Sequence, residues 1–257
     1  MTRTLLLIAG ASFVLAVACL AGAAALGFHE FGGHHWGHRW NVNFDDGHHV
    51  WFHDDGTSNT TVAADGQSAS RDIAWSGGDS LDIDVPGDVQ YTQAAGPAKI
   101  TVTGPADMVN HVVVSGSHLQ LDQDGDFSGT VKVVMTAPNV RHFSISGSDT
   151  LAIANYDQDE LDLDVSGSGN VTAKGKAHAA KVDISGDSEV DFGGLAVESA
   201  EASISGSGRA ALAPTASADL HISGSGEIDL ITHPPQVSSD VSGSGRIVEG
   251  QPVPRPS

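Results

Sequence analysis

The residues best suited to chemistry are histidines gathered between residues 29 and 53. This segment carries seven of the thirteen histidines of the chain, with acidic residues and tryptophans between them. Imidazole binds zinc, copper and nickel, and carboxylates can complete the ligand shell of such a metal. We therefore expect that the segment can hold a divalent transition metal loosely. The ligand candidates are His29, His34, His35, His38, His48, His49 and His53.

A polar linker without a specific ligand is the alternative interpretation of this segment. His34 and His38 are four residues apart, as are His49 and His53, and this spacing would place two ligands on one face of a helix. The glycines between them disfavour a helix. No cysteine lies in the segment, and the ligand spacing of a structural zinc site is missing. Residues 27–71 are therefore predicted to form a polar and largely disordered linker.

Sequence motifs of common enzymes are missing from the chain. The sequence has no Gly-x-Ser-x-Gly, P-loop or His-Glu-x-x-His. The enzymatic alternative is a β-helix that acts on polysaccharides, because such enzymes place carboxylates and basic residues in a groove. The residues for that reading are Lys174, Lys176, Lys181, Asp162, Asp164 and Asp183. Outward strand positions are normally polar, so we interpret these residues as a solvated surface and predict that the chain is not an enzyme.

The strongest pattern in the sequence is a repeated tetrad of Val or Ile, then Ser, then Gly, then Ser or Asp. Its serines recur every 18 to 20 residues. They are Ser146, Ser166, Ser185, Ser205, Ser223 and Ser242. A related copy at Val114-Ser115-Gly116-Ser117 lies 31 residues before the first of them, which indicates one longer or irregular turn.

Apolar residues flank each tetrad at fixed offsets and alternate with polar ones, so each repeat should contain two short strands with one buried face. A unit of about 19 residues cannot bury that face alone, but stacked copies share a continuous core. An antiparallel sandwich also spaces its strands regularly, yet its hairpins need not repeat the same residue types. We therefore predict an all-β fold, a right-handed parallel β-solenoid over residues 72–248.

The tetrads themselves should form the corners of this solenoid. The repeated glycine indicates a backbone with positive φ, or a place without room for a Cβ atom. The serine hydroxyls are expected to stack in a ladder and to satisfy the backbone groups of the corner.

The repeated (Val/Ile)-Ser-Gly-Ser-Gly tract and the stretch before it resemble a family, the putative auto-transporter adhesin, head GIN domain family of bacterial envelope proteins. In that stretch the alternating Leu81-Asp82-Ile83-Asp84-Val85 and Lys99-Ile100-Thr101-Val102 precede Leu119-Gln120-Leu121. The resemblance covers residues 72–248. It implies a β-solenoid in the cell envelope, its name points to adhesion, and it offers no catalytic residues to transfer.

The first residues of the chain predict export. Arg3 is followed by an uncharged run over residues 5–26 that ends in small residues with the spacing that signal peptidase accepts. The run is also long enough to span a bilayer uncleaved. Residues 1–26 are therefore predicted to be a signal peptide or a membrane anchor, and residues 249–257 a proline-rich tail.

The net charge of the chain limits the classes of partner that it can bind. The net charge of −20 argues against nucleic acid, whose binding needs clustered Lys and Arg. We predict a non-catalytic, exported envelope protein in the periplasm or on the cell surface of a bacterium, without a cofactor. Its partner would be a protein or glycan surface, and its oligomeric state is left open. A periplasmic metal-binding protein is the main alternative, and the polysaccharide-acting enzyme is the weaker one.

Overall fold

The computed structural model describes residues 42–43, 49–51, 60–63, 68–122 and 127–250. The predicted signal or anchor segment, most of the predicted linker and most of the tail lie outside these residues. Within the predicted linker, β1 (Val42–Asn43), β2 (His49–Trp51) and β3 (Thr60–Ala63) pair antiparallel in that order, and β3 pairs with β4. Part of that segment is therefore extended rather than irregular.

The remaining elements are almost all strands. They are β4 (Ala69–Ala74), β5 (Ser80–Asp84), β6 (Gly87–Gln93), β7 (Lys99–Gly104), α2 (Ala106–His111), β8 (Val112–Ser115), β9 (His118–Leu121), β10 (Val131–Ala137), β11 (His142–Gly147), β12 (Thr150–Gly167), β13 (Asn170–Gly186), β14 (Glu189–Gly206), β15 (Arg209–Leu212), β16 (Pro214–Gly224), β17 (Glu227–Leu230), β18 (Gln236–Gly243) and β19 (Arg246–Glu249).

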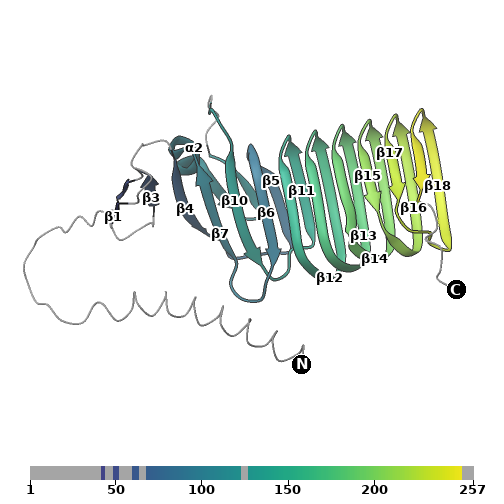
Figure 1. Cartoon of the computed structure of the whole chain (residues 1–257), viewed down its shortest axis with the longest axis horizontal. Helices are drawn as coiled ribbons and strands as arrows, with labels where there is room; N and C mark the ends of the chain where they lie inside the picture. Colours follow the sequence, from purple (N-terminus) through teal and green to yellow (C-terminus); the bar gives the residue numbers. More distant parts are fainter. Residues whose placement is uncertain (1–41, 44–48, 52–59, 64–67, 123–126, 251–257) are drawn as a thin grey trace, which may run out of the picture. The chain divides into compact units, whose positions relative to one another are not determined.

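From β11 onward the chain is a parallel β-solenoid, as predicted (Figure 1). The strands before each tetrad glycine stack in the order β11, β12, β13, β14, β16 and β18, with each tetrad serine beside the next. We call the outward side of these strands the pre-corner face. The strands after the tetrad stack likewise, ending in β15, β17 and β19.

The corner glycines behave as their repetition predicts. Gly167 has a φ of 122°, and a Cβ atom there would lie 2.3 Å from the carbonyl oxygen of Gly147 in the rung before. Backbone N–H groups close the corners, as when Ser168 donates to the Gly147 oxygen at 2.8 Å. The expected role of the serine hydroxyls is seen at one corner, where Ser188 donates to the Gly167 carbonyl oxygen at 3.0 Å and accepts the Gly169 N–H at 3.1 Å.

The first part of the domain departs from the repeat. Val114-Ser115-Gly116-Ser117 is not a corner, because β8 pairs antiparallel with β9 and Ser115 faces His118. Gly116, with a φ of 65°, lies in the two-residue turn of this hairpin. The turn and the second strand of this hairpin, β9, lie within the 31-residue gap between Ser115 and Ser146. Glycine followed by serine suits a tight hairpin turn and a solenoid corner alike.

The rung made by β5 and β6 comes early in the chain but lies inside the stack. β5 pairs with β9 on one side and with β11 on the other, while β6 lies between β10 and β12. The connection from β10 to β11 therefore passes this rung before the regular repeats begin.

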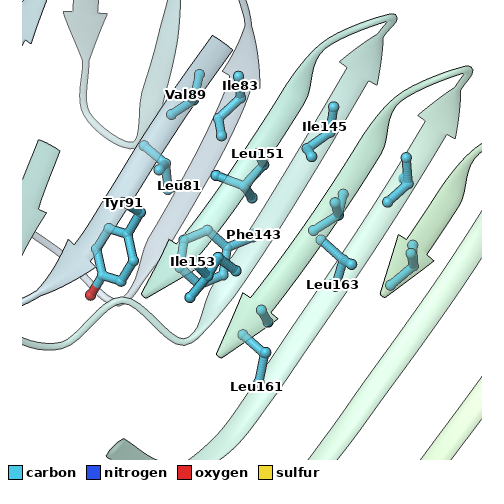
Figure 2. Close-up of a cluster of buried hydrophobic side chains, with 14 of the residues drawn as sticks. Leu81, Ile83, Val89, Tyr91, Phe143, Ile145, Leu151, Ile153, Leu161 and Leu163 are labelled. Carbon is cyan, nitrogen blue, oxygen red and sulfur yellow. The ribbon is translucent and has the colours of Figure 1, made fainter. Parts of the chain in front are cut away.

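The predicted inward columns form the core. Figure 2 shows those of the first rungs, where Leu81, Phe143 and Leu163 follow one another from strand to strand. The ring of Phe143 packs edge-on against Tyr91, with ring centroids 5.1 Å apart. The last rung is the exception, because Ser239 and Val241 are exposed.

Candidate binding groove

A groove of about 1010 Å³ lies along one edge of the solenoid. Its floor is the middle of β12, β13 and β14, where each strand bends from one side of the rung to the other. Its walls are the loops of residues 76–79, 96–98 and 138–141. These loops belong to the irregular early part of the domain, so the groove lies where the two parts meet.

The bends arise from local departures from the repeat. The rungs were predicted to contain two short strands, but β12, β13 and β14 run unbroken for 18, 17 and 18 residues. Register shifts fall at their bends, between Ile153 and Tyr156 on β12. Asn155 has a φ of 56°, and a Cβ atom on Gly175 would lie 2.1 Å from the Tyr156 carbonyl oxygen. Each bend therefore needs its own residues, which hides it from a repeat analysis.

Charged side chains of both signs line the groove in pairs. Lys176 lies 3.1 Å from Asp157, and Arg141 lies 3.5 Å from Asp79. His178 reaches Asp159 at 3.7 Å and Glu198 at 3.3 Å.

The carboxylates outnumber the cations in this lining. Counting the lining residues gives four acids, Asp79, Asp157, Asp159 and Glu198, and two fixed bases, Arg141 and Lys176, so with neutral histidine the net charge is −2. Such a lining repels acidic ligands and accepts neutral or amino-bearing ones.

Two glutamines fix the floor of the groove to its walls. The Gln93 side chain donates to the Asp157 carbonyl at 3.1 Å and accepts from the Asp157 N–H at 2.8 Å. Gln158 donates to the Val140 carbonyl oxygen at 3.0 Å. These bonds join segments 64 and 18 residues apart in the sequence. The groove is thus held open by polar contacts rather than by loops alone.

The residues of the polysaccharide hypothesis do not gather in this groove. Lys176 lines it, but Lys174 does not. Lys181 lies on the pre-corner face, with its Nζ atom 3.2 Å from Asp183. The Asp162 carboxylate accepts a hydrogen bond from the His142 ring at 3.0 Å on the same face.

Asp164 also belongs to the pre-corner face, where its side chain is exposed. Its pKa is raised by partial burial, and the neighbouring carboxylates of Asp162 and Asp183 raise it further. The three acidic residues of the hypothesis therefore share the pre-corner face with Lys181, while Lys176 lines the groove. Lys174, Lys176 and Asp164 are exposed, as predicted. Lys181, Asp162 and Asp183 are half-buried instead, and the Oδ1 atom of Asp162 is buried without a hydrogen-bond partner.

The metal hypothesis concerns residues of which the structure says little. Of the seven candidate histidines only His49 falls in a described strand, β2, and the other six lie outside the described residues. Within the described ranges no group of three His, Cys, Asp or Glu is placed to hold a metal. The metal site of residues 29–53 stays a prediction.

Asp149 lies beside a second, smaller hollow of about 450 Å³, at the first tetrad corner. It takes the place of Gly169, Gly208 and the equivalent glycines of later corners, and it is 4% exposed. Its Oδ1 atom accepts the N–H of Gly87 at 3.2 Å. Burial raises its pKa from 3.8 to about 6, against the lowering effect of that bond. Sequence reasoning missed it because a single Asp in an Asp-rich chain gives no signal.

Residues 79–234, more than half of the chain, match the model of a family described as "Putative auto-transporter adhesin, head GIN domain". The chain belongs to this family. The resemblance noted from the sequence is thereby confirmed, and the chain is an adhesin-like protein of an envelope family.

One solved structure supports this fold, and two others are reported for comparison. A putative adhesin from Bacteroides fragilis superposes with a TM-score of 0.60 at 24% identity, over 71% of this chain and 97% of that one. A putative adhesin from Parabacteroides merdae gives a TM-score of 0.47 at 22% identity, over 72% and 97%. A putative lipid binding protein from Parabacteroides distasonis gives 0.44 at 20% identity, over 72% and 98%. None of the curated proteins matches the chain. In the described ranges no helix is long and apolar enough to cross a bilayer.

Proposed function

We propose that this head GIN domain protein is a non-catalytic contact module, exported to the cell surface, that holds a protein or glycan in the groove beside its bends. The observation that carries the proposal is the groove itself. It has a volume of about 1010 Å³, polar groups of both signs line it, and Gln93 and Gln158 fix its floor to neighbouring segments. The groove is polar and already ordered before a ligand arrives. Binding therefore costs little conformational entropy of its side chains and loops.

The positions of the unusual titratable groups support binding rather than catalysis. Burial raises the pKa of Tyr91 to about 12, and it also raises the pKa of Tyr156. Both tyrosines are buried in the core, and Asp149 lies in a corner beside the smaller hollow. Active sites are where strongly shifted groups are usually concentrated, and these groups do not line the groove.

The lining also indicates which partners fit. Its net charge of −2 disfavours acidic glycans. Neutral or amino-bearing sugars, or a peptide segment with basic residues, would find carboxylates as acceptors and Lys176 and Arg141 as donors. Tyr156 and Trp75 are buried nearby. We therefore do not expect a glycan to bind by stacking its sugars on these rings.

The test is binding of the full chain to immobilised oligosaccharides of neutral, amino-bearing and acidic kinds, and to mucin, collagen and fibronectin. Lys176→Glu changes a charge inside the groove, and Lys132→Glu makes the same change on the exposed side of β10, outside it. We expect a neutral or basic probe to bind the wild type and to lose affinity only with Lys176→Glu. Equal effects of the two variants, or a preference for acidic probes, would contradict the proposal.

A further inference from the structure

The two ends of the stack differ in how they are covered. At the early end α2 packs against β4 and β7, and Met108 and Val109 of this helix are fully buried. At the other end β18 is the last long strand of the stack (Figure 1), and all eight of its residues are exposed. Val237 and Val241 there are 42% and 41% exposed.

The last rung keeps part of the apolar core instead of replacing it. Val241 continues the column of Ile222, and Val237 continues that of Ala218. Between them Ser239 takes the place that Leu220 has in the rung before. A terminal repeat that faces only solvent is expected to carry a polar outer face. The two valines are therefore an apolar surface that the described part of the chain leaves uncovered.

The edge of β18 is also available for strand pairing. Among the described strands β18 pairs with β16 on one side and with none on the other. Edge strands that avoid pairing usually carry lysine, proline or an inward-pointing charge. β18 has neither lysine nor proline, and its one charged residue, Asp240, follows the outward column of His221.

We propose that a second copy of this chain docks on this end, with β18 pairing antiparallel to β18 of the other copy. The sequence of β18 is complementary to itself in an antiparallel pairing. In a pairing centred on Ser239, Val237 lies opposite Val241 of the second copy on the inner side, and the reverse holds by symmetry. On the outer side Asp240 lies opposite Ser238, so like charges do not face each other.

The same geometry limits the assembly to two copies. A symmetric pairing of β18 with β18 uses the same edge on both copies and leaves no second copy of that edge free. The association therefore closes after one contact. Each copy has a net charge of −20. Salt should therefore strengthen the dimer by screening the repulsion between copies.

The test is sedimentation equilibrium of the full chain at low and high salt. Val241→Lys places a charge on the proposed contact, and Val134→Lys places the same charge on β10, at a valine that is also 42% exposed. We expect a wild-type dimer that is stronger in salt, a dissociation constant raised at least about tenfold by Val241→Lys, and no change with Val134→Lys. Circular dichroism shows whether each variant is folded, and Val237→Lys replaces Val241→Lys if the latter is not.

Three outcomes would overturn the proposal. They are a monomeric wild type, a dimer that Val241→Lys leaves intact, and a monomer that dimerises only after removal of residues 251–257, which would make the tail the occupant. None of the contact residues lines the groove. Failure here therefore leaves the proposed binding function standing.

Discussion

Asp149 is the residue whose ionisation should matter most for stability. Its pKa is raised in the folded protein from 3.8 to about 6, chiefly by burial. The folded state therefore binds a proton that the unfolded state releases earlier. The stability contributed by the protonated carboxyl is complete below pH 3.8 and is lost as the pH rises to about 6.

Asp149→Asn is predicted to raise the melting temperature at pH 7.5 and to have little effect at pH 3.5. The amide keeps an oxygen to accept the Gly87 N–H and removes the buried charge. The gain at pH 7.5 should be at most about 3 kcal/mol. Thermal unfolding followed by circular dichroism measures it, and Asp88→Asn, at an exposed site, is the control. An equal gain at both pH values would contradict the assigned cause.

The corner glycine Gly186 has a steric role that alanine cannot fill. Its φ is 125°, and a Cβ atom would lie 2.3 Å from the Gly167 carbonyl oxygen. Gly186→Ala should lower the free energy of unfolding by at least about 3 kcal/mol. Gly78→Ala, where the nearest atom would be 3.8 Å away, should change it by less than about 1 kcal/mol. Chemical denaturation measures the free energy of unfolding of both variants. Similar losses of stability in the two would refute the steric explanation.

At the scale of elements, the contact between β6 and the bend of β12 shapes the groove. Gln93→Ala removes both hydrogen bonds to the backbone of Asp157. Because the contact is exposed, we expect a loss of about 1–2 kcal/mol in stability. Faster hydrogen exchange at residues 156–159 should accompany it. Gln90→Ala changes an exposed position on the same strand. It should neither lower the stability nor speed hydrogen exchange at the bend. Unchanged exchange at the bend would show that the floor is held by other contacts.

The elements that repeat could be predicted from the sequence, and those that do not repeat could not. Leu163, Val182 and Ala202 stack because parallel rungs place equivalent residues side by side, so periodicity alone gave the core. The β8–β9 hairpin was misassigned, because Gly116 serves a hairpin turn and resembles a corner. The groove was missed because its walls come from single, non-repeated loops.

At the scale of the whole molecule, the histidine-rich segment is the candidate for a metal-binding function separate from the solenoid. If it binds metal, the full chain should take up Zn²⁺ or Ni²⁺ in a calorimetric titration, and a chain without residues 27–56 should not. The reason is that the candidate ligands all lie in that segment. Equal metal uptake by both chains would place the ligands elsewhere.

The most direct test of a surface contact module is protease accessibility on intact cells that produce the full chain with an epitope tag after Ser257. We expect protease added to intact cells to remove the tag, because the domain would face the outside of the cell. Removal of the tag only after the outer membrane is opened would contradict the account. It would place the domain in the periplasm and move the metal-binding alternative ahead.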